Sequence, residues 1–204
     1  MNPQNGQTPL DYLNEISPTS QKKAPLFALN LRTVIFGGIL LVILIIIFTV
    51  ISGSISGSQK EPWQRLSVKI TNTEAVVNSS SSNIKNSQLR SINSDLKLYL
   101  ANTKRDLAAP LAAQGIKVAD IPASVTAKES SKAMTERLED GRLNAKYDST
   151  YAREMSYQTA TLLALINQLY KSSALPATKT YLKGAYENLE PTYKALSAFS
   201  ASNE

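Results

Sequence analysis

The amino-acid sequence predicts an all-α protein in which a single N-terminal transmembrane helix precedes an up-and-down bundle of four or five helices. Two observations carry this prediction. An uncharged apolar run covers residues 33–51, and from Pro62 onward apolar side chains recur at the three- and four-residue spacings of amphipathic helices. The sustained alternation that would indicate strands is absent from the sequence, which has only eight glycines.

The run from Thr33 to Ile51 has the length of a membrane-spanning helix. Its nineteen residues would extend roughly 28 Å at 1.5 Å per residue, close to the thickness of a bilayer's hydrocarbon core. The alternatives are a buried core helix, which needs more surrounding protein than this chain supplies, and a cleaved signal peptide, whose apolar run is shorter and begins earlier. The serines that follow the run leave cleavage open as an alternative.

Basic residues on the two sides of this run indicate its orientation. Lys22, Lys23 and Arg32 precede it, and Lys60 and Arg65 follow it. Arg32 is adjacent to the run, whereas Lys60 is nine residues from Ile51. The positive-inside rule therefore favours a cytoplasmic N-terminus. The expected location is the bacterial cell membrane, with a single pass and an extracytoplasmic C-terminal domain.

Composition divides the rest of the chain into three segments. Residues 1–32 are rich in Asn, Gln, Pro, Ser and Thr, which is typical of a disordered tail. Within it, residues 9–18 are a docking motif for a cytoplasmic partner, a helical turn on the membrane surface, or an uncommitted part of the tail. Residues 52–61 predict a flexible Gly/Ser linker, and residues 62–204 the helical bundle.

The first two helices of the bundle are predicted from their apolar stripes. The first begins at Pro62, a residue suited to a first helical turn, and ends in the polar run at residues 78–82. The second covers Leu89 to Leu111, with a kink at Pro110 and a left-handed terminator at Gly115. A loop is expected from Gly115 to Thr126.

Three further helices complete the prediction. The Thr126–Glu129 capping box opens a short third helix that runs to Leu138 and is broken by residues 139–141. The fourth carries a stripe from Leu143 to Leu169 and ends within residues 172–176. The fifth runs from Ala177 and is expected to bend at Pro191.

Three stretches of the predicted bundle resemble a family of exported bacterial ferritin-like domains of unknown function. They are Thr103–Ile116, which ends Leu-Ala-Ala-Gln-Gly-Ile, Tyr147–Met155, which is similar to a Phe-Asp-x-x-Tyr segment, and Glu190–Lys194, which is similar to a Leu-Pro-Thr-Leu-Arg segment. Together with the helix order, the resemblance covers residues 62–200 and implies a ferritin-like bundle.

The resemblance does not carry the family's histidines. Family members typically have histidines at the positions that align with Asn102, Gln158 and Leu196, whereas this chain contains no histidine. Ferritin-like metal sites combine Glu with Glu-x-x-His, so neither a metal nor another cofactor is expected. The carboxylates on the predicted helices are interpreted as solvated: Glu74, Asp95, Asp106, Glu136, Asp148, Glu154 and Glu187.

Composition also argues against catalysis. The chain has neither histidine nor cysteine, which removes the usual bases and thiol nucleophiles. A Ser–Lys pair is available in residues 130–132, on the predicted third helix, but lysines beside serines are frequent by chance. The sequence shows no phosphate-binding glycine loop, and we expect no enzymatic activity.

Tyrosines are the most distinctive remaining feature, because most of them fall in the last two predicted helices. Their rings could line a groove for a peptide or a sugar. The competing interpretation is structural, with Tyr147 and Tyr151 in the core and their hydroxyls at its rim. The candidate binding surface consists of Tyr147, Tyr151, Tyr170, Tyr181, Tyr186 and Tyr193.

Two functional hypotheses follow. The first is a membrane-tethered, non-catalytic extracytoplasmic domain that binds or scaffolds at the cell envelope. Its partners would be the lipid bilayer and an envelope protein or anionic wall polymer. The chain after the anchor has 19 basic and 14 acidic residues, and this surplus of positive charge favours contact with anionic surfaces. Nucleic acid is not expected because the basic residues are scattered. The alternative is a ferritin-like metal-handling protein or enzyme. The oligomeric state is left open.

Overall fold

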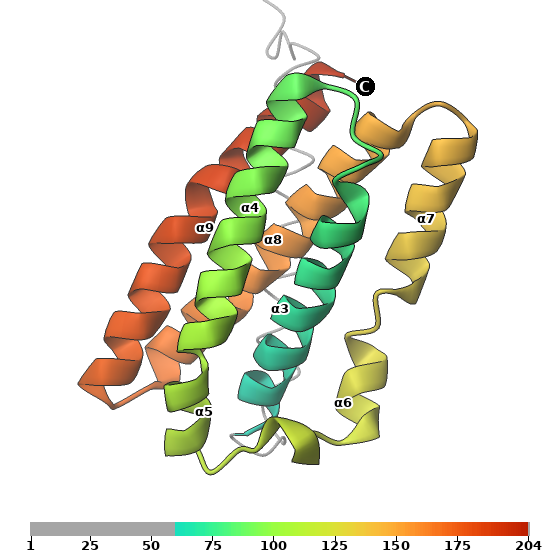
Figure 1. Cartoon of the computed structure of the whole chain (residues 1–204). Coiled ribbons are helices and arrows are strands. Elements are labelled where there is room, and N and C mark those ends of the chain that lie inside the picture. The colour runs from blue at the N-terminus through green and yellow to red at the C-terminus, as the bar shows by residue number, and fades with distance from the viewer. Residues whose placement is uncertain (1–59, 204) are drawn as a thin grey trace, which may run out of the picture. The chain divides into compact units, whose positions relative to one another are not determined.

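The computed structural model of the chain describes residues 60–203, and this part is entirely helical, which confirms the predicted all-α class (Figure 1). Its helices are α3 (Glu61–Ser80), α4 (Ser87–Asp106), α5 (Ala108–Ala113), a 3-10 turn (Val118–Asp120), α6 (Ala123–Lys128), α7 (Lys132–Leu143), α8 (Tyr147–Ser172) and α9 (Pro176–Ser202).

Four long helices form the bundle. Helix α8 packs most extensively on α9, α3 packs on α4 and α8, and α4 also packs on α9, so the four stand at the corners of a square. Helices α3 and α9 run in one direction, and α4 and α8 run in the opposite direction (Figure 1). Between α4 and α8, the chain returns along the outside of the bundle through α6 and α7 (Figure 1). The connection between α4 and α8 is therefore one long crossover.

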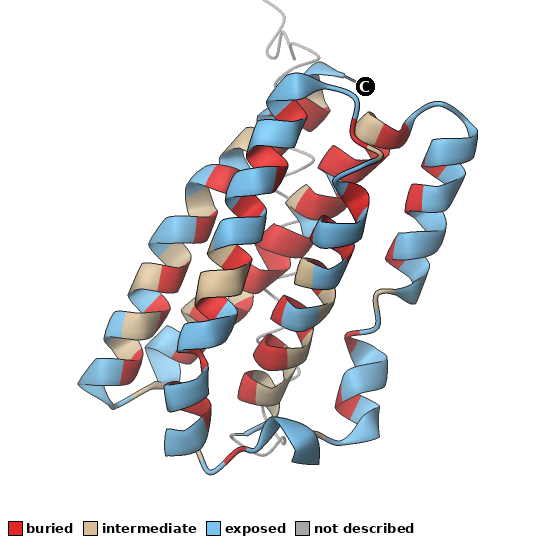
Figure 2. Ribbon diagram, in the orientation of Figure 1, coloured by how far each residue is buried: buried red, intermediate tan, exposed pale blue. Residues whose placement is uncertain are grey.

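The core lies where the apolar stripes of these four helices meet. Buried residues face the interior on all four, while outward faces are exposed (Figure 2). The largest fully enclosed side chains are Leu66, Ile70, Leu89, Leu96, Leu100, Leu107, Tyr151, Met155, Leu162, Leu165, Ile166 and Leu169. Removing such large apolar side chains from water is the main favourable contribution to folding.

The first two predicted helices agree with the structure to within a few residues. Pro62 lies in the first turn of α3, and the helix ends at Ser80 inside the predicted polar run. The predicted second helix is divided into α4 and α5 around Leu107, three residues before the proline expected to kink it. Gly115 terminates α5 with a φ of 62°, which confirms the predicted left-handed terminator.

The predicted third helix is wrong at both ends. Thr126 lies inside the short α6, which ends at Lys128, and a second helix, α7, begins at Lys132. Helix α7 then continues through residues 139–141 to Leu143. Gly141 therefore does not break the helix. A glycine is needed at this position for packing, because a Cβ there would lie 2.6 Å from Thr150 Oγ1 of α8.

The last two predicted helices correspond to α8 and α9. Helix α8 ends at Ser172, as expected, but Leu143 belongs to α7 and is 68% exposed, so its assignment to the buried stripe was wrong. Helix α9 is continuous across Pro191.

Three predicted segments lie outside the described residues: the tail at 1–32, the transmembrane helix at 33–51, and all of the 52–61 linker except its last two residues. Among the helices of residues 60–203, none combines the length and apolar character needed to cross a membrane.

Candidate functional site

Helices α8 and α9 enclose a groove on the flank of the bundle, which we call the tyrosine groove. It has a volume of about 340 Å³. Helix α8 contributes Ile166, Asn167 and Tyr170, and α9 contributes Leu182, Lys183, Tyr186, Glu187 and Glu190. The four-residue steps from Ile166 to Tyr170 and from Leu182 to Tyr186 place each pair on one helix face, which is why two aliphatic and two aromatic side chains meet here.

The tyrosine groove combines an apolar base with a polar edge. Ile166 and Leu182 have no exposed surface, whereas Tyr170 is 38% exposed, and the ammonium of Lys179 lies 5.5 Å from the centroid of its ring. Lys183 and Glu187 form an ion pair of 3.7 Å along the edge. Tyr186 is half-buried, so Tyr170 supplies the exposed aromatic ring. An exposed ring beside hydrogen-bonding side chains suits the binding of a peptide or a sugar.

Tyr147 and Tyr151, two of the predicted site residues, lie in the core. Their rings stack with centroids 6.2 Å apart and an interplanar angle of 13°. The buried hydroxyl of Tyr151 donates to Asn93 Oδ1, and Asn93 Nδ2 donates to Ser81 Oγ over 3.1 Å. The prediction that this hydroxyl lies at the rim was therefore wrong. Burial raises the pKa of Tyr151 far above its ordinary value.

The remaining two predicted tyrosines, Tyr181 and Tyr193, lie outside the tyrosine groove. The Tyr181 hydroxyl donates to the carbonyl oxygen of Thr103 over 2.9 Å and so joins α9 to α4, and its burial raises its pKa. Tyr193 is half-buried, and its pKa is raised mainly by that burial. Of the six predicted residues, the structure brings only Tyr170 and Tyr186 together in this groove.

A second and larger depression, which we call the end pocket, occupies one end of the bundle. Its volume is about 560 Å³. It is lined by Ser82, Asn83, Lys85, Asn86, Arg142, Ala145, Lys146, Tyr147, Asp148, Ser149, Phe199 and Asn203. Its lining comes from three separate stretches of the chain, residues 82–86, 142–149 and 199–203, so no local sequence pattern predicted it. Only Tyr147 was among the predicted site residues.

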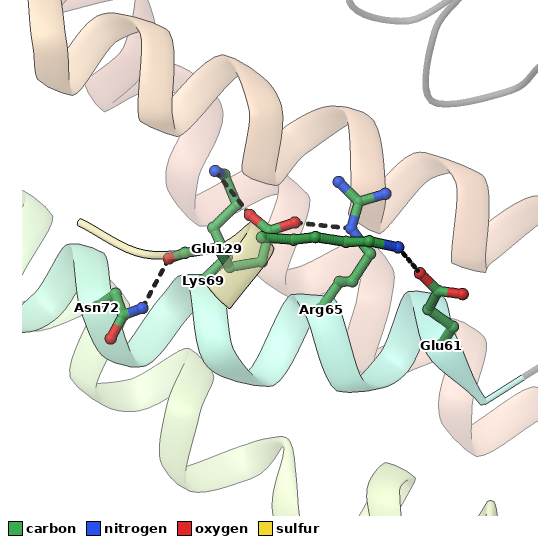
Figure 3. Close-up of polar contacts among 6 residues, drawn as sticks. Glu61, Arg65, Lys69, Asn72 and Glu129 are labelled. Atoms are coloured by element: carbon green, nitrogen blue, oxygen red, sulfur yellow. Dashed lines mark hydrogen bonds and ion pairs between the residues drawn. The ribbon is translucent and has the colours of Figure 1, made fainter. Parts of the chain in front are cut away.

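A cluster of charges joins the connection between α6 and α7 to α3 (Figure 3). The side chain of Glu129 is only 4% exposed and accepts from Arg65 Nε over 2.6 Å and from Lys69 Nζ over 3.2 Å. Asn72 Nδ2 donates to the Glu129 carbonyl oxygen over 2.7 Å. Both carboxylate oxygens are occupied by these cations, so the arrangement serves as an ionic clasp between two segments.

Glu154 is a second buried carboxylate, and its expected solvated position was wrong. It is held by a two-pronged hydrogen bond from Arg137, with both donor–acceptor distances 2.7 Å, which joins α7 to α8. This bond raises the pKa of the Arg137 guanidinium. The Ser–Lys pair is also placed differently from the prediction, since Ser130 and Ser131 precede α7.

Between residues 60 and 203, no three side chains of the His, Cys, Asp or Glu type lie close enough together to hold an ion. Of the positions aligned with the family's histidines, Gln158 and Leu196 are buried and Asn102 is half-buried.

No family model, curated protein or solved structure matches the chain. The function of this protein is therefore inferred from its sequence and from the geometry of the tyrosine groove and the end pocket.

Proposed function

We propose that this protein is a membrane-tethered, non-catalytic binding or scaffolding domain of the cell envelope, with residues 1–32 in the cytoplasm and the bundle outside. The observation that carries the proposal is the uncharged run at residues 33–51, which matches the hydrocarbon core in length. The Gly/Ser linker that follows supplies a flexible tether, so the bundle would act at a distance set by the linker.

The described bundle supports binding rather than chemistry. Its most deeply buried carboxylates, Glu129 and Glu154, already have cationic partners, and the chain contains no histidine or cysteine to serve as a base or nucleophile. The tyrosine groove offers exposed aromatic surface of the kind enriched at recognition sites. These features favour a module that holds a partner at the envelope.

Membrane fractionation tests the tether. The full chain is expected to stay with membranes after an alkaline carbonate wash, while a chain lacking residues 33–51 is expected in the aqueous fraction. Protease added to intact cells should degrade the bundle and spare the N-terminal tail. Full-length protein in the aqueous fraction contradicts the anchor, and a protected bundle reverses the proposed orientation.

Site-specific photo-crosslinking tests the groove. A crosslinker at Lys183, on the edge of the tyrosine groove, should capture an envelope component in cells, and Tyr170→Ala with Tyr186→Ala should reduce the yield severalfold. Tyr157→Ala is the matched control, because Tyr157 is 46% exposed and lies outside the groove. Equal yields from the two variants would place recognition elsewhere on the bundle.

One observation favours the ferritin-like alternative. The bundle has a single long crossover between its second and third long helices, a connection that ferritin-like folds also use. This likeness supports a metal-handling protein or enzyme by analogy of fold alone. Metal analysis of the purified protein separates the two functions, since stoichiometric iron, manganese or zinc would favour the alternative.

A further inference from the structure

The end pocket is assembled where four segments meet at one end of the bundle. They are the α3–α4 turn, the end of α7, the start of α8 and the end of α9 (Figure 1). Lys60, where the described chain begins, lies at the opposite end and donates to the carbonyl oxygen of Gly115. Helix α3 has 20 residues, so about 30 Å separates the two ends.

The end pocket has an excess of positive charge. Three basic residues and one acidic residue line it. Asp148 is occupied, because its two carboxylate oxygens accept from the backbone N–H groups of Lys85 at 3.0 Å and Asn86 at 2.7 Å. Arg142 is also occupied, by Glu139 of its own helix at 2.5 Å.

Of the charged groups that line the end pocket, the ammonium groups of Lys85 and Lys146 are the ones that can pair with a ligand. Both side chains are exposed, and within residues 60–203 no carboxylate forms an ion pair with either. They come from separate turns, one before α4 and one before α8, yet line the same depression. Two such lysines attract an anion to this pocket.

The rest of the lining is suited to a hydroxyl-rich molecule. Tyr147 and Phe199 supply aromatic surface, though each keeps less than a tenth of its area exposed. Ser82 and Asn83 offer a hydroxyl and an amide in the α3–α4 turn. Asn203 adds the oxygen of its side-chain amide from the end of α9, since its Nδ2 already donates to the Phe199 carbonyl oxygen over 2.8 Å and to Ser202 Oγ over 3.0 Å. Amide and hydroxyl groups next to aromatic rings match the alternating polar and apolar surface of a sugar.

We propose that the end pocket binds an acidic saccharide, a sugar unit that carries a carboxylate or a phosphate. Lys85 and Lys146 contact the anionic group, while the amides and hydroxyls hydrogen-bond to the ring hydroxyls. The volume of about 560 Å³ lies within the range of small-molecule sites. The inference adds a ligand and a second site to the proposed function, and it depends on neither the tether nor the tyrosine groove.

Calorimetric titration of the full chain in detergent tests this site. The probes are oligogalacturonate, which carries sugar carboxylates, and mannose 6-phosphate, which carries a sugar phosphate; maltohexaose is the neutral counterpart and polyphosphate the sugar-free anion. Binding of either acidic sugar is expected, with weaker binding of both comparison ligands. Lys85→Ala with Lys146→Ala should weaken it by about tenfold, since two charge-assisted contacts are lost.

Matched variants separate this site from general charge and from the groove. Lys97→Ala with Lys171→Ala removes the same charge from exposed positions elsewhere and should leave the affinity nearly unchanged, as should Tyr170→Ala with Tyr186→Ala. An equal loss in the Lys97/Lys171 variant overturns the proposal, as does equally tight polyphosphate. Absence of binding by either acidic sugar, with circular dichroism showing an intact fold, also overturns it.

Discussion

Two helix ends close with the same hydrogen-bonding motif but with different residues at the strained position. After α5, Ile116 N donates to Leu111 O over 3.0 Å and Gly115 adopts a φ of 62°. After α7, Lys146 N donates to Gly141 O over 2.7 Å and Ala145 adopts a φ of 56°. This is the Schellman motif, in which glycine is favoured because a Cβ is strained in the left-handed region.

Exchanging alanine and glycine at these two positions should therefore have opposite effects on stability. Ala145→Gly relieves the left-handed strain and should raise the free energy of unfolding by about 0.5–1 kcal/mol after the entropy gained by the unfolded chain is subtracted. Gly115→Ala should lower it by about 1–2 kcal/mol, although the new Cβ would meet only Lys60 Nζ, at 3.6 Å. Urea unfolding measures both, and a destabilised Ala145→Gly variant would show that Ala145 is not strained.

The buried hydroxyl of Tyr151 gives a second test on single residues. Tyr151→Phe leaves Asn93 Oδ1 without its donor inside the bundle and should cost about 1–3 kcal/mol of unfolding free energy. Tyr157→Phe is the control, because Tyr157 is 46% exposed, and it should change the stability by less than about 0.5 kcal/mol. Equal effects in the two variants would mean that the Tyr151–Asn93 hydrogen bond adds nothing to stability.

Among the elements, the crossover formed by α6 and α7 is held differently from the four long helices. Its buried apolar residues are few: Val125 in α6, and Met134 and Leu138 in α7. Ion pairs also attach it, through Glu129 to α3 and through Arg137 to α8. Segments with few buried apolar contacts open at low free energy, so the crossover should be the first part of the bundle to open.

Loss of the ionic clasp should release the crossover without unfolding the bundle. Glu129→Gln keeps the shape of the side chain but removes the charge that pairs with Arg65 and Lys69, leaving those cations without their anion in a poorly hydrated place. Hydrogen exchange in α6 and the start of α7 is expected to accelerate by about tenfold or more, while α8 stays protected.

A matched carboxylate provides the control for that experiment. Glu136 lies on the exposed side of α7 and reaches Lys132 only at 4.0 Å, so Glu136→Gln should leave the exchange rates nearly unchanged. Uniform acceleration across α3, α4, α8 and α9 in Glu129→Gln would contradict a local clasp, since it would mean that Glu129 stabilises the whole bundle.

The same elements show what could be read from the sequence. The long helices have continuous apolar stripes, so their periodicity located them to within a few residues. The crossover was mispredicted because the Thr126–Glu129 capping box is a local pattern, whereas Glu129 binds Arg65 and Lys69, about sixty positions away. Gly141 was misread for a similar reason, since its partner Thr150 is on another helix.

The candidate sites, like the helices, could be predicted only where they depend on local spacing in the sequence. Helical spacing placed Tyr170 and Tyr186 on adjoining helices, and the structure brings them together in the tyrosine groove. Spacing could not tell these two from Tyr151 and Tyr181, whose hydroxyls find partners on α4. The end pocket depends on four segments meeting at one end of the bundle, which no local pattern records.

For the molecule as a whole, the absence of histidine and cysteine determines how the free energy of unfolding depends on pH. With no histidine or cysteine in the chain, no side chain has an ordinary pKa between about 5 and 8. The free energy of unfolding should therefore be nearly constant across this interval. The groups that respond next as the pH rises are the tyrosines, and Tyr151 and Tyr181 are the two whose pKa is most strongly raised by burial.

Alkaline pH should then weaken the fold through these two tyrosines. Both remain protonated in the bundle when the unfolded chain, with an ordinary tyrosine pKa of 10.0, has begun to lose its protons. The folded state binds more protons above that pH, so stability that is complete below it falls as the pH rises, by up to about 1.4 kcal/mol per pH unit for each tyrosine. Urea unfolding at several pH values measures the slope, and Tyr151→Phe and Tyr181→Phe should each make it shallower. Slopes equal to that of the unsubstituted protein would mean that these hydroxyls ionise in the folded bundle, and absorbance at the tyrosinate band would detect that ionisation directly.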